Sequence, residues 1–130
     1  MKLATREWVD KAEADFAAAL LLRSSRKRFC RDLVCFHLQQ CVEKCLKARL
    51  EEAAIAFPKT HDLERLLGLA LAVEPLWASM RPAVAALTAY AVEVRYPGAS
   101  ATPAEARALL RAATRIRGMI RNALGLPATK

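Results

Sequence analysis

Hydrophobic residues recur at intervals of three and four residues along most of the chain, which is the spacing of amphipathic α-helices. Trp8 and Phe16, for example, fall on one side of the first such stretch, with charged residues elsewhere around the axis. The pattern predicts helices over residues 5–24, 29–56, 60–70 and 83–93, followed by a last helix that begins at Pro103.

The last helix has the clearest boundaries. Thr102 is placed as the N-cap, Pro103 occupies the first helical position, and Glu105 completes a capping box. Gly125 and Pro127 follow where a helix would end. These local signals predict both limits of the helix.

Prolines separate the earlier segments. Pro58 is expected to end the long second helix, and Thr60 to begin the third, with acidic residues in its first turn. Pro75 and Pro82 bracket a break before the fourth helix. Short connections of this kind favour neighbouring helices that run antiparallel.

Four substantial helices and one shorter piece predict an all-α protein, an up-and-down four-helix bundle with one additional short helix. Hydrophobic residues make up 55% of the 130 residues, which is enough for one core, and no linker divides the chain. We therefore expect a single domain over residues 1–130.

Charge narrows the choice of partner only partly. The chain has a formal net charge of +8 and a pI near 9.8, which permits nucleic acid, an acidic protein or anionic lipid as partner. Every candidate apolar run is interrupted well before the roughly 18 residues that a membrane helix needs, and the N-terminus does not resemble a secretory leader. We expect a cytoplasmic protein without a membrane partner.

The four cysteines are expected to be reduced thiols in that compartment. Cys41 and Cys45 lie four residues apart, but the chain contains no Cys-x-x-Cys pair, the spacing that zinc sites commonly use. We interpret these thiols as small core residues and expect neither a metal nor a cofactor.

Three polar motifs follow one another along the chain: Gln-Gln-x-x-Glu-Lys-x-x-Lys over residues 39–47, Lys-Thr-His-Asp-Leu over residues 59–63, and Arg-Tyr-Pro over residues 95–97. Asp15 and Asp32 precede them. In this order and spacing, and with these helix boundaries, the chain resembles the HEPN family, the higher eukaryote and prokaryote nucleotide-binding domain. The resemblance covers nearly the whole chain and is to the small stand-alone prokaryotic type.

The resemblance implies a helical bundle that often forms a homodimer and is frequently encoded beside a minimal nucleotidyltransferase. Many members are metal-independent ribonucleases of toxin–antitoxin or defence systems. Their motif is an arginine followed, after four to six residues, by a histidine. In this chain Arg95 matches the arginine, but Ser100 stands where the nearest histidine spacing would fall.

This departure matters for the chemistry. Cleavage through a ribose 2′-hydroxyl needs one group to accept a proton and another to donate one near neutral pH. An arginine can hold a phosphate and stabilise developing charge, but it does neither proton transfer, and an unperturbed serine hydroxyl is too weak a base. The sequence therefore predicts binding of a nucleotide or RNA without efficient cleavage.

Arg95 is the leading candidate for a phosphate contact, and Tyr96 could stack on a base beside it. The alternative is structural, with Tyr96 packed on the bundle and Arg95 paired with Glu93 or an acid of another helix. Lys44, Lys47 and His61 are further candidate contacts for a nucleotide or RNA.

The polar residues of the second helix also have two interpretations. Glu43 and Lys47 form a favourable i,i+4 ion pair, and Gln40 and Lys44 can join them in one patch. That patch suits a phosphate, a nucleotide or a partner helix, but it also suits an ordinary polar surface of a bundle or dimer. His61 has two interpretations as well: a residue that faces the same patch, or one that orients the loop, which is the more common role of a histidine in a Thr-His-Asp turn.

The last helix carries five arginines on one broad side. They could contact successive phosphates of a nucleic acid, or they could form a solvated face that pairs with acids of the first helix. They are Arg107, Arg111, Arg115, Arg117 and Arg121.

Three functional hypotheses remain open from the sequence. The first is a HEPN protein of a toxin–antitoxin-like pair that binds a nucleotide, RNA or a nucleotidyltransferase partner, with ribonuclease activity weak or lost. The second is an active ribonuclease toxin that uses Arg95 at a dimer cleft, with His61 or another group transferring protons. The third is a dimerising interaction module without a nucleic-acid ligand.

Overall fold

The computed structural model describes residues 1–93 and 97–128, and the regular structure in these ranges is entirely helical. The predicted all-α fold is confirmed. The elements are α1 (Leu3–Leu22), α2 (Arg28–Glu52), α3 (Leu63–Ala70), the 3-10 helix η1 (Pro75–Met80), α4 (Arg81–Glu93) and α5 (Pro103–Ala123).

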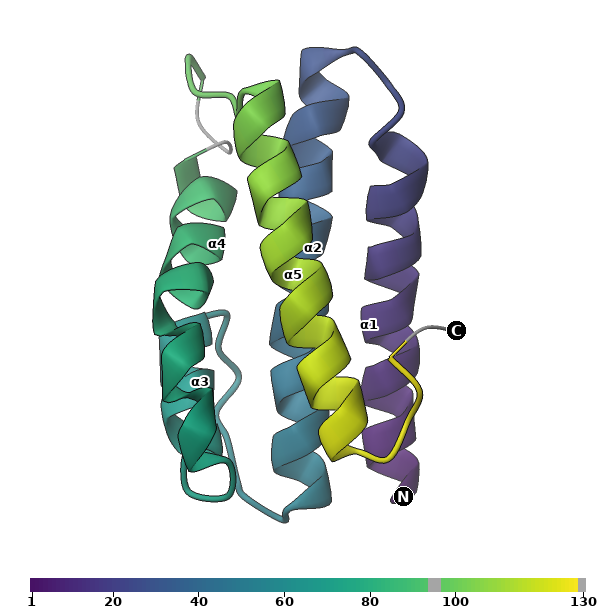
Figure 1. The fold of residues 1–130 in the computed structure, drawn as a ribbon, viewed down its shortest axis with the longest axis vertical. Coiled ribbons are helices and arrows are strands. Elements are labelled where there is room, and N and C mark those ends of the chain that lie inside the picture. Colours follow the sequence, from purple (N-terminus) through teal and green to yellow (C-terminus); the bar gives the residue numbers. More distant parts are fainter. Residues whose placement is uncertain (94–96, 129–130) are drawn as a thin grey trace.

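The four long helices run alternately up and down, as Figure 1 shows. α1 and α2 pack along most of their length, α5 lies across α2, and α4 lies beside α5 with α3 below it. The expected four-helix bundle with one short extra helix is therefore confirmed. Over the described residues, no helix is long and apolar enough to cross a bilayer.

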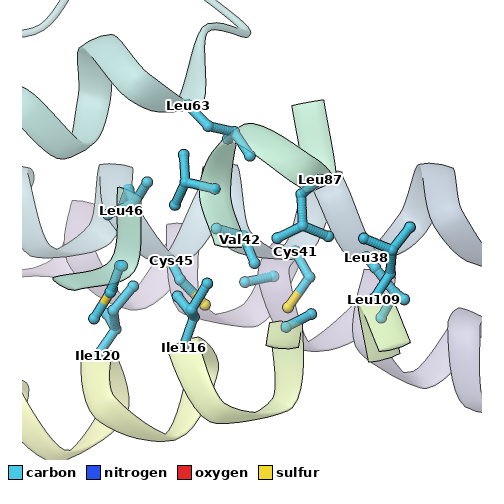
Figure 2. Packing of buried hydrophobic residues seen from close by; sticks show 14 of the residues in the cluster. Leu38, Cys41, Val42, Cys45, Leu46, Leu63, Leu87, Leu109, Ile116 and Ile120 are labelled. Carbon is cyan, nitrogen blue, oxygen red and sulfur yellow. The ribbon is translucent and has the colours of Figure 1, made fainter. Parts of the chain in front are cut away.

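The core forms where α2 meets the other helices. Leu38, Val42 and Leu46 of α2 are fully buried and face Leu87 of α4 and Ile116 of α5 (Figure 2). These contacts repeat every one or two turns because apolar residues recur at the helical period. α2 is the central helix of the bundle, so its polar residues lie next to buried surface.

Both ends of α5 follow the predicted local signals. The Thr102 side chain accepts from the Glu105 amide, and the Glu105 carboxylate accepts from the Thr102 amide, which completes the capping box. At the other end, Gly125 has a φ of +75°, and the Leu126 amide donates to the Arg121 carbonyl at 2.8 Å. This is a Schellman-type ending.

Two predicted boundaries near the third helix were wrong. α2 ends at Glu52, not near residue 56, because Ala54 adopts a left-handed φ of +57°. α3 begins at Leu63 with Asp62 as its N-cap, not at Thr60, because the Asp62 carboxylate accepts two backbone N–H bonds. Thr60 instead accepts from the Asp62 amide at 3.1 Å and orders the preceding turn.

The expected break around the two later prolines is also smaller than predicted. Pro75 opens the 3-10 helix, which continues directly into α4 at Arg81. Pro82 then lies in the first turn of α4, where a missing backbone N–H leaves no helical hydrogen bond unmade.

Candidate functional site

The polar motif of α2 divides between two clusters of buried and half-buried charges. The first contains Asp15 of α1, whose side chain is 11% exposed. His37 Nδ1 lies 2.8 Å from one of its carboxylate oxygens, and Lys44 Nζ lies 2.5 Å from the other. The carboxylate thus contacts two side chains that lie about two turns apart on α2. Lys44, a predicted ligand contact, is held against α1 and remains 22% exposed.

The second cluster is centred on Glu43, whose side chain is only 3% exposed. Lys47 Nζ lies 3.1 Å from Glu43 Oε2, as the predicted i,i+4 pair requires, and His61 Nδ1 lies 2.9 Å from Oε1. Gln39 donates to Oε1 at 3.4 Å and to the His61 carbonyl at 3.3 Å. These contacts fix the turn before α3 to the middle of α2.

Lys47 has little freedom to meet a ligand directly. Its side chain is 8% exposed, and its ammonium lies 5.2 Å from the centre of the Trp8 ring, at a distance suited to a cation–π contact. The Lys47 charge is therefore satisfied inside the protein by Glu43 and Trp8. The structure brings Lys47 and His61 together on Glu43, whereas Lys44 joins Asp15 in the other cluster.

His61 differs from every other member of the two clusters in being open to solvent. Its side chain is 75% exposed although Nδ1 contacts a buried carboxylate. A carboxylate that holds one ring nitrogen orients the imidazole, which is how a positioned acid or base is commonly built. His37, in contrast, is 26% exposed beside Asp15.

Arg95 and Tyr96, the leading candidates from the sequence, lie outside the described residues. The end of the segment that contains them is fixed to α2. Asp32 accepts from the Ala101 amide at 2.9 Å and from the Ser100 hydroxyl at 3.1 Å, and Arg31 donates to the Ala101 carbonyl at 3.1 Å. The Ser100 hydroxyl, at the position of the missing histidine, is thus engaged by a carboxylate.

The comparison with protein families decides the family. The family model for the HEPN domain matches residues 5–123, which is most of the 130-residue chain. The chain belongs to the HEPN domain family. No curated protein and no solved structure matches it. Membership points to a function connected with nucleotides or RNA.

Asp15 and Asp32, which belong to the sequence pattern of the HEPN family, have identifiable structural roles in this HEPN domain. Asp15 binds α1 to two residues of α2, and Asp32 binds the start of α2 to the segment before α5. His37 is the half-buried partner of Asp15. An isolated acid inside an apolar helical stretch was the sequence signal for such a contact.

The basic side of α5 is not uniform. Arg107, Arg111 and Arg115 are exposed, but Arg117 and Arg121 are buried against Glu13 of α1. The Arg117 guanidinium makes a two-bond contact with the Glu13 carboxylate, and this hydrogen bonding raises the pKa of Arg117 further. Pairing with an acid of the first helix is confirmed for these two arginines, but they do not form a solvated face.

The cysteines have no arrangement suited to metal or nucleophilic chemistry. All four are free, and Cys35, Cys41 and Cys45 are buried. Burial raises the pKa of Cys35 to about 11, and a hydrogen bond with Cys45 together with burial raises the pKa of Cys41. Across residues 1–93 and 97–128 no group of three or more acidic, histidine or cysteine residues could hold a metal ion.

Proposed function

We propose that this HEPN protein binds a nucleotide or RNA and does not cleave RNA efficiently. One observation carries the proposal: the segment from Arg95 to Thr102 keeps the phosphate-binding arginine of the HEPN ribonuclease motif but contains no histidine. Loss of a proton-transfer group typically lowers the rate about 100- to 10,000-fold. A guanidinium alone still binds phosphate strongly.

The contacts of the described residues support this assignment. Ser100 at the histidine position donates to Asp32 rather than standing free as a base. Neither histidine of the chain lies in the segment from Arg95 to Thr102: His37 contacts Asp15, and His61 contacts Glu43. In the proposed site, Arg95 contacts a phosphate and Tyr96 a base, Lys44 and His61 are exposed enough to contribute, and Lys47 acts by positioning Glu43.

A second candidate, an active ribonuclease, is favoured by one specific feature. His61 is an exposed imidazole oriented by the buried carboxylate of Glu43, and such a pair suits a general acid or base. In this candidate, Arg95 stabilises the phosphate in a dimer cleft and His61 transfers the proton that the missing motif histidine would have transferred.

A cleavage assay separates the two candidates. A labelled oligoribonucleotide would be incubated with the wild type, Arg95→Ala and His61→Gln, with His37→Gln as the matched histidine control. The binding function predicts no multiple-turnover cleavage by any of these proteins. Cleavage that is lost in both Arg95→Ala and His61→Gln but kept in His37→Gln would establish the ribonuclease instead.

The assembly we propose is a homodimer in the cytoplasm, paired with a minimal nucleotidyltransferase in a toxin–antitoxin-like system. Two exposed apolar side chains of α2 support a self-association surface: Phe29 is 61% exposed and Leu33, one turn later, 43%. Sedimentation equilibrium tests this part. We expect a dimer that dissociates in the Phe29→Ser/Leu33→Ser variant, and a wild type that stays monomeric would refute it.

A further inference from the structure

A groove lies at the end of the bundle where α1 passes into α2 and where α5 begins. In Figure 1 this is the upper end, where the connection from α1 to α2 and the first turn of α5 lie at the same level. The groove has a volume of about 700 Å³. Sites for small molecules commonly enclose about 300 to 1,000 Å³, so its size suits a nucleotide.

Positive charge surrounds this groove. Its lining includes five arginines and no acidic residue. They come from α2, α5 and the connection between α1 and α2: Arg23, Arg26, Arg31, Arg107 and Arg111.

Within the described part of the chain, no ion pair joins any of these five arginines to a carboxylate. Like charges gathered without acids repel one another, and a bound anion relieves that repulsion.

The contrast with the other half of α5 is informative. Arg117 and Arg121, about four and five turns after the helix start, are paired with Glu13 and buried. Arg107 and Arg111 lie on the same helix one and two turns after its start, exposed and facing a groove without acids. The helix thus uses its C-terminal arginines in packing and leaves its N-terminal pair available for an external anion.

Hydrogen bonds fix the inner part of the groove. Arg31 Nε donates to the Ala101 carbonyl at 3.1 Å, which ties one lining guanidinium to the segment before α5. The nearest acids are used elsewhere: Asp32 accepts from the Ala101 amide, and Glu105 from the Thr102 amide. The inner arginine is therefore positioned before any ligand arrives.

The wall between the arginines is apolar. Val34 of α2 and Pro103, Ala106 and Leu110 of α5 line it. Such a surface offers contact to the face of a nucleobase, while guanidinium groups beside it bind phosphate. An inorganic anion would use only the arginines, so the combination of wall and charge favours a ligand with both an aromatic and a phosphate part.

We propose that this arginine groove, lined by Arg23, Arg26, Arg31, Arg107 and Arg111, binds a nucleoside phosphate, either a free nucleotide or one nucleotide of an RNA strand. The phosphate lies on the arginines of α5 and the α1–α2 connection, and the base lies on the apolar wall. The ligand class rests on the proposed function, but the groove shares none of the candidate contacts named there.

The test uses two variants of α5 that carry matched charge changes. Arg111→Ala removes a groove arginine, and Arg115→Ala removes an exposed arginine one turn later that does not line the groove. Binding of a labelled oligouridylate is measured by fluorescence anisotropy at increasing salt, with unlabelled ATP as competitor. We expect Arg111→Ala to raise Kd about tenfold and to lower the salt slope by roughly 0.7, and Arg115→Ala to change Kd less than about twofold.

The remaining outcomes separate this proposal from the proposed function. The first such outcome is that the wild type binds oligouridylate, Arg95→Ala weakens binding, and Arg111→Ala has no more effect than Arg115→Ala. This result would refute binding in the groove and leave the proposed function intact. If the wild type binds neither oligouridylate nor ATP, both are overturned. Competition by ATP supports a free nucleotide in the groove, and groove-dependent oligouridylate binding without competition supports an RNA strand. Circular dichroism checks that each variant is folded.

Discussion

Removing one partner of the ion pair between Lys47 and Glu43 is predicted to destabilise the folded protein. At 3.1 Å, two unit charges attract by about 5 kcal/mol if the effective dielectric constant is about 20, before desolvation is subtracted. Replacing Lys47 by methionine keeps the side-chain volume but leaves the Glu43 carboxylate, 3% exposed, without its ammonium partner. Loss of one member of a buried pair costs about 3 to 5 kcal/mol.

We expect a value near the lower limit for Lys47→Met, about 3 kcal/mol, because His61 and Gln39 still contact the carboxylate. Urea unfolding followed by circular dichroism at pH 7 measures it. With an m-value of about 1.5 kcal/mol per molar urea, the midpoint falls by about 2 M.

Two controls define this experiment. Lys11→Met removes an exposed lysine of α1 and is expected to change the free energy of unfolding by less than about 0.5 kcal/mol. The double variant Glu43→Gln/Lys47→Met removes both charges and should recover most of the loss. A loss below about 1 kcal/mol in Lys47→Met, or a double variant as unstable as the single, would show that the pair is effectively solvated.

Three further predictions follow from the described contacts. Cys30 alone should react rapidly with a thiol reagent in the folded protein, because the other three thiols are buried and the pKa of Cys35 is raised to about 11. If the Cys30→Ser variant still contains one rapidly reacting thiol, the prediction is wrong. A hydrogen bond from the Tyr90 hydroxyl, followed by one from the Thr102 amide, lowers the pKa of Glu105 in the folded protein. The stability that Glu105 contributes is therefore present above the pKa that it has in the unfolded chain. It is lost as the pH falls through the lower pKa that it has in the folded protein. Glu105→Gln should therefore lower the melting temperature at neutral pH more than in acid, and an equal change at both would refute it. Gly125→Ala should cost about 1 kcal/mol in urea unfolding because φ is +75°, and an unchanged midpoint would contradict the strain.

The sequence was sufficient for the architecture because the decisive signals are local. Apolar spacing located the helices, and the capping box around Thr102 set the start of α5. The end of α2 and the start of α3 were predicted wrongly, also for local reasons. Ala54 adopts a left-handed conformation without being glycine, and Asp62 competes with Thr60 for the N-cap. Apolar spacing contains no information on either choice.

The site was less predictable because it depends on which helices meet. The pairing of Glu43 with Lys47 follows from spacing on one helix, but the contact of His61 with the same carboxylate depends on the turn before α3. Likewise, one stripe of arginines on α5 separates into a buried part and an exposed part only because Glu13 of α1 lies opposite Arg117. A single sequence does not place these partners.

The central claim, that this HEPN protein binds nucleotides or RNA without cutting RNA, is tested most directly by one titration. A labelled oligoribonucleotide is followed by fluorescence anisotropy as protein is added at low and at physiological salt, and the same samples are then run on a denaturing gel. We predict saturable binding that weakens steeply as salt rises, with the RNA intact after prolonged incubation. Absence of saturable binding at low salt, or multiple-turnover degradation of the RNA, would contradict it.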